Sequence, residues 1–324
     1  MTAILRSLLT LWAARTGLVQ ACLLVLSLLA LPASAHAIDI LRLARAESAD
    51  DRRLDYTDAL LFEAMRRTTR KFGPYQIQRA PEFLSRERLL DETLRGEVVN
   101  VTAVPSQPAW EEKLYTIWIP VDLGVADYRI SLIRKDQQAR LSAVKTLDDL
   151  KTLSMGIGTL WSSRKIYEDN GFDVTVGADY EALFRMLLAG RFVHFPRGVN
   201  EVFTEFKDRQ ASFPDLAIDR ALVVQFPFPR YFFVTPKASR LAQRVEAGLE
   251  SMVRDGTMMK MMLKYHADMI RQANFCTRRL FRIPNPLLSP KTPLDRKEFW
   301  FNPYDPKTGI CPKTATLPRQ PSTR

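Results

Sequence analysis

The sequence predicts an α/β fold in which helices cover the faces of a parallel sheet. Short apolar runs of strand length alternate with amphipathic stretches of helical length along most of the chain. One of these runs, VVNVTAV at 98–104, is almost continuously apolar, as strands buried on both faces are. Alternation of this kind indicates a parallel sheet with helices packed on it.

The first third follows the order strand, helix, strand, helix, strand. Both helices have an apolar face and end at a glycine, and the second begins at Ser85, a residue type favoured at the N-cap. The predicted elements are a strand at 38–44, a helix at 56–73, a strand at 75–80, a helix at 85–96 and the strand at 98–104.

The middle of the chain begins differently, because 113–122 and 127–136 are both predicted strands with no helix between them. The alternation then resumes at a helix opened by a capping box of Thr146 and Asp149. The further elements are helix 145–153, strand 154–159, helix 160–171, strand 173–177, helix 179–190, strand 191–196 and helix 199–206.

A strand at 230–236 and two helices, at 239–256 and 257–270, complete the regular pattern. Beyond Cys276 the composition changes: nine of the 20 prolines fall between Ile283 and Arg324, without helical periodicity. We expect an extended tail there, loosely ordered near its end.

The N-terminus is typical of a secretory signal peptide. Arg6 and Arg15 precede an apolar run at 18–31, and Ala35 and Ala37 form a small-residue cleavage site. The run is shorter than the ~20 residues that span a bilayer, although an uncleaved anchor stays open because a longer apolar stretch lies upstream of Arg15. We expect a cleaved signal at 1–37 and a periplasmic protein.

Cys276 and Cys311 are the cysteines that remain after cleavage. In an oxidising compartment, one disulfide between them is the simplest expectation. Chain entropy predicts about 3–4 kcal/mol of stabilisation for a loop of this size. The chain has no C-x-x-C motif, and only His194 and His266 remain as imidazoles, so we expect no metal and no cofactor.

The formal net charge of +11 is compatible with nucleic acid, an anionic surface or an anionic small ligand as partner. Export argues against nucleic acid, and we expect none. A scattered positive surface that favours solubility is the plainest interpretation of the charge.

Four segments have sequences and an order that are typical of one protein family: ISLIRKD at 130–136, KTLDDLKTLSMGIGT at 145–159, YEALFRMLLAGRFVHF at 180–195 and RVEAGLESMVRDGTMMKMMLKY at 244–265. In this order they resemble the bacterial extracellular solute-binding proteins of family 3, the periplasmic receptors of polar amino-acid ABC transporters. The resemblance covers roughly 38–270.

The resemblance implies a type II periplasmic-binding-protein-like fold, in which two α/β lobes are joined by two hinge strands and the ligand lies between the lobes. Closure would bend the chain near 128–132 and 225–230. The implied domains are a signal peptide at 1–37, lobe 1 at 38–132 and 227–275, lobe 2 at 133–226 and a proline-rich tail at 276–324.

Two departures from the family bear on the ligand. The family's amino-acid binders carry an arginine soon after the third strand, but no arginine lies between Arg95 and Arg129. They also carry an aspartate for the ligand ammonium, at the place where this chain has His194. Both halves of the amino-acid clamp are missing, and we expect a small polar ligand, with an anionic one favoured.

Arg197 is the leading candidate for binding an anion. It follows a predicted strand and precedes a predicted helix, where a guanidinium and free backbone N–H groups would act together. The alternative is a surface arginine paired with Glu201 or Glu205. Asn200, in the next turn, is a weaker companion.

The remaining candidates come from loops that the resemblance places at the cleft. The turn after strand 154–159 would offer hydroxyl, backbone and aromatic contacts, although its tryptophan could instead pack on Tyr167. The candidates are Tyr56, Ser106 and Gln107 in lobe 1 and Thr159, Trp161 and Ser162 in lobe 2.

We therefore expect a monomeric solute-binding protein that presents its ligand to an inner-membrane ABC permease or to a periplasmic sensor domain. Two alternatives stay open. One is a ligand-free interaction module of the same fold. The other is a dehydratase-like enzyme, for which Glu201 is the one carboxylate we can place near Arg197; we expect no enzyme.

Overall fold

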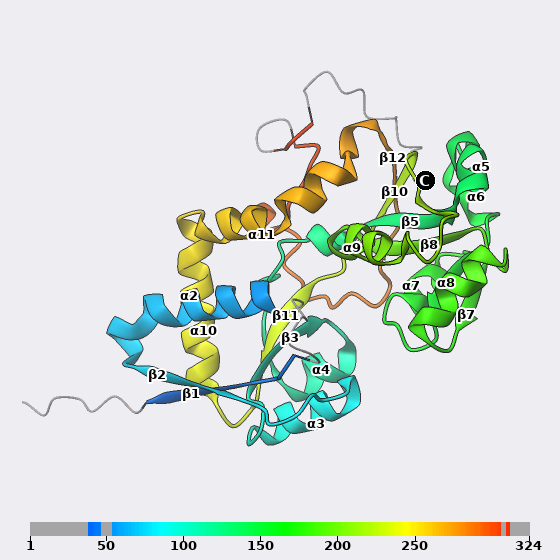
Figure 1. Cartoon of the computed structure of the whole chain (residues 1–324). Helices are drawn as coiled ribbons and strands as arrows, with labels where there is room; N and C mark the ends of the chain where they lie inside the picture. The colour runs from blue at the N-terminus through cyan, green and yellow to red at the C-terminus, as the bar shows by residue number, and fades with distance from the viewer. Residues whose placement is uncertain (1–37, 47–53, 306–308, 312–324) are drawn as a thin grey trace, which may run out of the picture. The chain divides into compact units, whose positions relative to one another are not determined.

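The computed structural model describes residues 38–46, 54–305 and 309–311. The predicted signal peptide at 1–37 lies outside the described residues. From Asp39 onward the chain forms one compact unit built around three sheets (Figure 1). Within the described ranges, none of the helices combines the length and apolar character needed to cross a bilayer.

Two small sheets form the first part of the molecule. Strands β1 (Asp39–Leu43) and β2 (Tyr75–Arg79) pair in parallel, and β3 (Val101–Pro105), β11 (Arg230–Val234) and β4 (Tyr115–Ile117) form an antiparallel sheet in the order β3-β11-β4. Asn100 joins the two sheets, because its backbone N–H donates to Arg42 O and its amide oxygen accepts from Arg42 N.

Helices α2 (Asp55–Phe72) and α10 (Ser239–Arg254) pack closely against each other beside β1 and β2 (Figure 1). The close approach depends on Gly248, where an added Cβ would lie 2.4 Å from the backbone oxygen of Ala64. Two further helices, α3 (Arg86–Arg95) and α4 (Pro108–Lys113), flank β3 in sequence.

The second part is a seven-stranded mixed sheet in the order β12-β10-β5-β8-β6-β7, with β9 also paired to β5. Its strands are β5 (Tyr128–Arg134), β6 (Met155–Gly158), β7 (Val174–Gly177), β8 (His194–Gly198), β9 (Leu216–Ile218), β10 (Leu222–Gln225) and β12 (Arg279–Arg282). Its helices are α5 (Gln138–Ala143), α6 (Leu147–Lys151), α7 (Arg164–Asp169), α8 (Tyr180–Leu188) and α9 (Val199–Arg209).

The chain crosses between the first and second parts between β4 and β5, between β10 and β11, and again before β12, which returns to the second sheet. We call 118–127 the first crossing segment and 226–229 the second. The hydrogen bond from Phe226 N to Asp127 O, at 3.2 Å, ties the two together. After the second crossing, α11 (Thr257–Ala273) follows α10 and packs against both α10 and α9.

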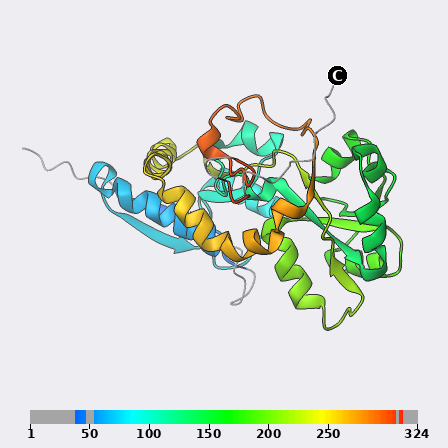
Figure 2. The ribbon, with the colours of Figure 1, turned by 90° about the horizontal axis from the view of Figure 1, so that it is seen from above.

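Within residues 274–305 and 309–311, the chain beyond α11 is packed against the rest of the molecule, and the end of the predicted tail lies outside the described residues. In this part, strand β12 adds to the edge of the second sheet, parallel to β10, and Phe299 and Phe301 are buried in the main core. Figure 2 shows this segment, drawn in orange to red, running mostly without regular structure. The predicted disulfide between Cys276 and Cys311 is confirmed, with Cα atoms 5.3 Å apart.

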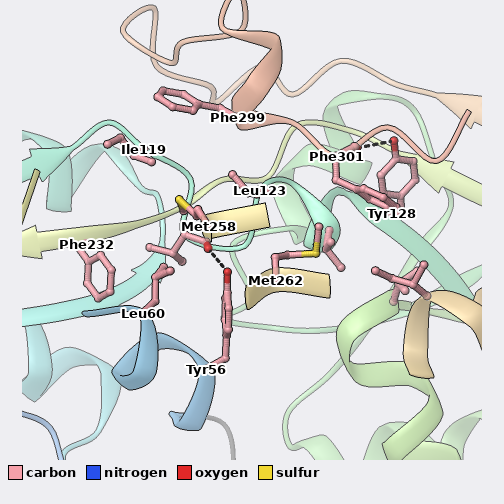
Figure 3. Close-up of a cluster of buried hydrophobic side chains, with 14 of the residues drawn as sticks. Tyr56, Leu60, Ile119, Leu123, Tyr128, Phe232, Met258, Met262, Phe299 and Phe301 are labelled. Atoms are coloured by element: carbon pink, nitrogen blue, oxygen red, sulfur yellow. Dashed lines mark hydrogen bonds between the residues drawn. The ribbon is translucent and has the colours of Figure 1, made fainter. Parts of the chain in front are cut away.

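The core beneath this segment is formed by residues that are far apart in the sequence. Figure 3 shows Tyr56 and Leu60 from α2, Met258 and Met262 from α11, and Phe299 and Phe301 gathered in one cluster. Phe301 also hydrogen-bonds the first crossing segment and the start of β5, because its backbone N–H donates to Leu123 O at 2.6 Å and its carbonyl accepts from the Tyr128 hydroxyl at 3.2 Å.

The α/β prediction is confirmed, and so are the local signals that cap helices. Ser85 accepts from Arg88 N, Thr146 and Asp149 form the capping box, and Asp179 accepts from Ala182 N.

Element boundaries were less predictable. The strand predicted at 113–122 is only the three-residue β4, and the helix α4 before it was missed. Pro108 at the start of α4 fits the first turn of a helix, where no N–H partner is needed. The strand predicted at 191–196 runs from His194 to Gly198, since its pairing with β5 begins only at Ile133.

Candidate functional site

A cavity of about 580 Å³ is the candidate binding site. Four stretches of chain line it: the residues after β3, those after β6 through α7, the second crossing segment, and part of the chain after β12. They are Ser106, Gln107, Pro108, Ala109 and Glu111; Thr159, Leu160, Trp161, Ser162, Arg164, Lys165, Ile166 and Glu168; Phe228 and Pro229; and Asn285, Leu287, Leu288 and Ser289.

Five of the eight predicted ligand-binding residues line this cavity: Ser106, Gln107, Thr159, Trp161 and Ser162. They come from two strand-to-helix turns that the fold brings together, one from each part of the molecule. Their role in binding remains a prediction, while their common location is a property of the structure.

The turn after β3 is fixed by backbone hydrogen bonding. Ser106 N donates to Pro229 O at 2.9 Å, which holds the turn against the second crossing segment. The Ser106 hydroxyl donates to Glu111 in α4. This wall of the cavity therefore presents the Ser106 hydroxyl and the Glu111 carboxylate, which are hydrogen-bonded to each other.

The turn after β6 depends on Gly158. A Cβ at this position would lie 2.5 Å from Nε1 of Trp161, so only glycine lets the indole fold back over the end of the strand. The Thr159 hydroxyl donates to Gly177 O at 3.0 Å, which holds this turn to the end of β7.

Trp161 packs differently from the alternative considered for it. The indole stacks on Phe195, with ring centroids 5.8 Å apart and planes at 16°. The guanidinium carbon of Arg197 lies 4.3 Å from the indole centroid. Trp161 is thus both a cavity wall and part of a cation–π contact.

Arg197 does not offer the free guanidinium expected of an anion receptor. Its Nε and Nη2 donate to the two carboxylate oxygens of Glu205, at 2.7 and 2.6 Å. The side chain is buried, and burial works against its charge, but Glu201 and Glu205 outweigh this effect and raise the pKa of Arg197. The structure contains the alternative expected for Arg197, a pair with Glu205. The pair is buried, whereas the sequence predicted it at the surface.

Tyr56 and Asn200 also lie outside the residues that line the cavity. Tyr56 is only 5% exposed, and its hydroxyl donates to Val121 O at 2.6 Å, as the dashed line in Figure 3 shows. Burial raises its pKa above the ordinary value for tyrosine. The Asn200 side-chain oxygen is buried without a hydrogen-bond partner among the described residues.

His194, which replaces the family's aspartate, is a buried strand residue. Its Nδ1 lies 2.9 Å from the Ser131 hydroxyl, and burial lowers the pKa of the imidazole to about 4. The ring is therefore neutral at physiological pH, and it is not part of the cavity wall.

Sequence reasoning missed the contributions of the second crossing segment and of the chain after β12. Phe228 and Pro229 belong to the sequence FPFPR, whose alternating prolines favour extended backbone. Asn285 lies between two prolines, and its amide donates to Pro227 O at 2.8 Å, which brings the later segment to the cavity. Only the proline spacing could have signalled an ordered segment here.

The charged residues on the α7 side of the cavity are paired among themselves. Arg164 contacts Glu168, and Lys165 contacts Asp169, each at 2.7 Å. Among the described residues, no three histidine, cysteine or acidic side chains are grouped in a way that could hold a metal ion.

Buried charges lie behind the cavity, at the crossing segments. Asp122 is 1% exposed and lies 3.8 Å from Arg230, and Asp127 accepts a hydrogen bond from Phe228 N at 2.8 Å. Burial is the main cause that raises the pKa of both carboxyl groups. Arg129, the first arginine after the arginine-free stretch, is buried in the same region.

No protein-family model matches the sequence, and no curated protein matches it. Solved structures do match. A probable amino-acid ABC transporter extracellular-binding protein, YtmK from Bacillus subtilis, aligns with a TM-score of 0.51 at 14% identity, over 70% of this chain and 97% of its own.

Two other structures are similar at slightly lower TM-scores. An ancestral arginine-binding protein bound to arginine gives 0.48 at 17% identity, over 71% of this chain and 99% of its own. An ancestral amino-acid-binding protein described as a precursor of cyclohexadienyl dehydratase aligns with a TM-score of 0.45 at 13% identity, over 70% of this chain and 95% of its own.

The likeness to YtmK, together with the sheet topology, defines the fold of the chain. It is the two-lobe α/β fold of extracellular solute-binding proteins, as the sequence motifs predicted. The first lobe contains the sheets of β1 to β4 and β11, and the second contains the seven-stranded sheet.

Proposed function

We propose that this chain is an exported solute-binding protein that binds a small polar, anionic ligand in the cavity and closes on it. One observation carries the proposal. The cavity is lined by the turn after β3 in one lobe and by the turn after β6 in the other. In α/β proteins, ligands bind at the carboxyl ends of strands, and a site shared by two lobes couples binding to their closure.

The size and lining of the cavity support a small ligand. A volume of about 580 Å³ falls in the range of small-molecule sites, which combine apolar walls with a few polar groups. Trp161 and Phe228 provide aromatic surface, and Gln107 and Ser162 provide polar groups.

The carboxylates at the cavity favour binding over catalysis. Glu111 accepts a hydrogen bond from Ser106, and Glu168 is paired with Arg164. Each of these two carboxylates is thus already engaged by a protein side chain. The proposal therefore includes no reaction. The partner that reads the closed form would be an ABC permease or a periplasmic sensor domain.

A thermal-shift screen of the purified full chain tests the proposal. Probes would be amino acids, carboxylic acids, inorganic phosphate and sulfate. A ligand at 100 times its dissociation constant stabilises the folded state by about 2.7 kcal/mol, which raises the melting temperature by degrees. Binding should also change Trp161 fluorescence, and a screen with no stabilising compound would contradict the proposal.

The hydrogen bonds of Phe301 favour a second candidate, an interaction module that does not close. They hold Leu123 in the first crossing segment and Tyr128 at the start of β5, and Tyr128 belongs to the predicted hinge at 128–132. Small-angle scattering separates the two functions, because a closing receptor contracts when a stabilising ligand is added and a rigid module does not.

A further inference from the structure

Arg129 is a buried arginine whose hydrogen-bonding capacity is largely unused. It lies in β5, paired with Gly198 of β8 and Val224 of β10, and only 7% of it is exposed. Its Nε and Nη2 atoms are buried, and neither has a hydrogen-bond partner among the residues that the structure describes. The carboxyl groups of Asp122, Asp127 and Glu201 interact with its charge electrostatically. The two buried N–H-bearing atoms still lack acceptors, and leaving buried donors without hydrogen bonds is costly.

Two aromatic rings stabilise the positive charge of Arg129. The Arg129 guanidinium carbon lies 4.6 Å from the ring centroid of Phe228 and 5.2 Å from that of Phe226. Such contacts stabilise a cation but do not satisfy its N–H groups. Phe228 also lines the cavity. The same ring is therefore in contact with Arg129 and with the space that a ligand would occupy.

Two further polar groups near the cavity are also without partners. The Tyr167 hydroxyl and the Asn200 side-chain oxygen are buried and have no hydrogen bond among the described residues. Tyr167 lies in α7 between Ile166 and Glu168, which line the cavity. Asn200, Glu201 and Arg129 approach the same point, since a Cβ on Gly198 would lie 2.4 Å from Asn200 Oδ1, 3.2 Å from Glu201 Oε2 and 3.5 Å from Arg129 Nη1. The Glu201 carboxylate therefore lies on the Nη1 side of the guanidinium and leaves Nε and Nη2 without an acceptor.

Arg197 provides the contrast. In the antiparallel pair of β5 and β8, Arg197 lies opposite Ile130, which is the residue after Arg129. Because successive side chains of a strand point to opposite faces, Arg197 and Arg129 lie on opposite faces of the sheet. Arg197 is fully engaged by Glu205. Arg129 has two N–H-bearing atoms without an acceptor, and an oxyanion with two oxygen atoms is the chemical group that fits such a fork.

We propose that Arg129 is the receptor for an oxyanion group of the ligand, which reaches it when the Phe228 ring moves out of the cavity wall. This inference rests on the proposed solute-binding function and names the ligand group and the residue that binds it. A carboxylate and a phosphate share the required chemistry. The Tyr167 hydroxyl, buried without a hydrogen-bond partner among the described residues, is an additional donor on the α7 side.

The test measures affinity by calorimetry on the full chain and its variants. The probes are succinate, citrate and glutamate as carboxylates, and inorganic phosphate and sulfate as tetrahedral oxyanions. Arg129→Met should weaken the best probe by about tenfold or more. Arg244→Met, which changes a buried arginine that does not line the cavity, is the matched control, and it should lower the melting temperature while leaving the affinity within about twofold.

A second pair of variants tests the inference with Arg129 intact. Phe228→Glu places a carboxylate beside the guanidinium and should compete with the ligand, whereas Phe228→Gln removes the ring without adding charge. We expect Phe228→Glu to weaken binding about tenfold more than Phe228→Gln does. This comparison still applies if Arg129→Met does not fold.

The outcomes distinguish a failure of the Arg129 inference from a failure of the proposed solute-binding function. If wild-type protein binds a probe and Arg129→Met binds it within about twofold, or the two Phe228 variants bind alike, Arg129 is not the receptor and the solute-binding function stands. If wild-type protein binds none of the oxyanions but is stabilised by an uncharged solute, the inference is likewise wrong. If no compound stabilises wild-type protein, both fail.

Discussion

Arg197 and Glu205 form an ion pair with two hydrogen bonds, from Nε to Oε2 at 2.7 Å and from Nη2 to Oε1 at 2.6 Å. The two side chains are 10% and 12% exposed. The pair links β8 to α9, and Trp161 stacks over the guanidinium. Arg197 thus stabilises the second lobe and supports one wall of the cavity.

Removing the arginine of this pair should destabilise the fold strongly. Arg197→Met leaves the Glu205 carboxylate buried without its main partner, and we expect a loss of about 3–5 kcal/mol in the free energy of unfolding. Urea denaturation measures it. Arg185→Met, which removes an exposed and loose 3.9 Å pair with Asp179, should cost under about 1 kcal/mol. Equal losses in the two variants would contradict the structural role of Arg197.

The parts of the fold that depend on neighbouring residues could be predicted from the sequence. Ser85, Thr146 and Asp179 bond to backbone groups three residues away, so their caps are encoded locally. The positions of the two turns at the cavity were also predictable, since 159 ends one of the motif segments and 106–107 closely follows a predicted strand. These turns contain the five predicted residues that do line the cavity.

The rest depends on contacts between distant residues. The sequence offered Glu201 and Glu205 as partners of Arg197, but it could not show that the pair would be buried or that Glu205 would take both hydrogen bonds. Tyr56 follows the first strand as a binding residue would, but its hydroxyl meets Val121, 65 positions later. Composition marked the chain after Cys276 as irregular, and it could not show that Phe299 and Phe301 belong to the core.

The disulfide should contribute to stability through the segment it closes. Changing Cys276 and Cys311 together to serine should lower the free energy of unfolding by about 3–4 kcal/mol, since the unfolded chain regains the freedom of the closed loop. Guanidinium denaturation with and without a reductant gives the comparison. Wild-type protein should lose stability in the reductant and the double variant should not, and insensitivity of the wild type would count against the bond.

Gly248 should tolerate no side chain. Glycine to alanine in a helix normally gains about 1 kcal/mol. At Gly248 the new methyl group would lie 2.4 Å from Ala64 O, and we expect a net loss of about 1–3 kcal/mol from overpacking. Gln243→Ala, at an exposed position of the same helix, is the control and should be close to neutral.

Because the Gly248 clash is with backbone, adding Ala64→Gly should not restore stability. Thermal denaturation of the single and double variants checks both statements. A stabilised Gly248→Ala protein would show that α2 and α10 are farther apart than the structure places them.

His194 should make the fold sensitive to mild acid. Burial lowers its pKa from 6.5 to about 4. Below pH 6.5 the unfolded chain therefore takes up a proton that the folded protein does not, so stability falls as the pH drops from about 6.5 to about 4. The full effect is roughly 3 kcal/mol.

The control for this effect is His194→Gln, which cannot titrate. Denaturant unfolding at a series of pH values should give a flatter profile for the variant in this window. The difference between the two profiles isolates His194 from His266, whose pKa is also lowered to about 4 by burial. Parallel profiles would mean that the imidazole at 194 is accessible to protons.

Arg244 should be the most sensitive charged position in the first lobe. It is fully buried, its Nη1 donates to Asp39 Oδ2 at 2.6 Å, and its Nη2 donates to Gly73 O at 2.7 Å. These bonds tie α10 to β1 and to the end of α2. Arg244→Met would leave a carboxylate and a carbonyl without this partner, and we expect a loss of about 3–5 kcal/mol.

Arg240 provides a control on the same helix, because it pairs with the same Asp39 but is 40% exposed. Water can replace an exposed guanidinium, so Arg240→Met should cost about 1 kcal/mol or less. Urea denaturation of both variants compares the two arginines against one carboxylate. A larger loss for Arg240→Met would mean that Asp39 depends on the outer arginine, and that burial of Arg244 adds nothing to the link between α10 and β1.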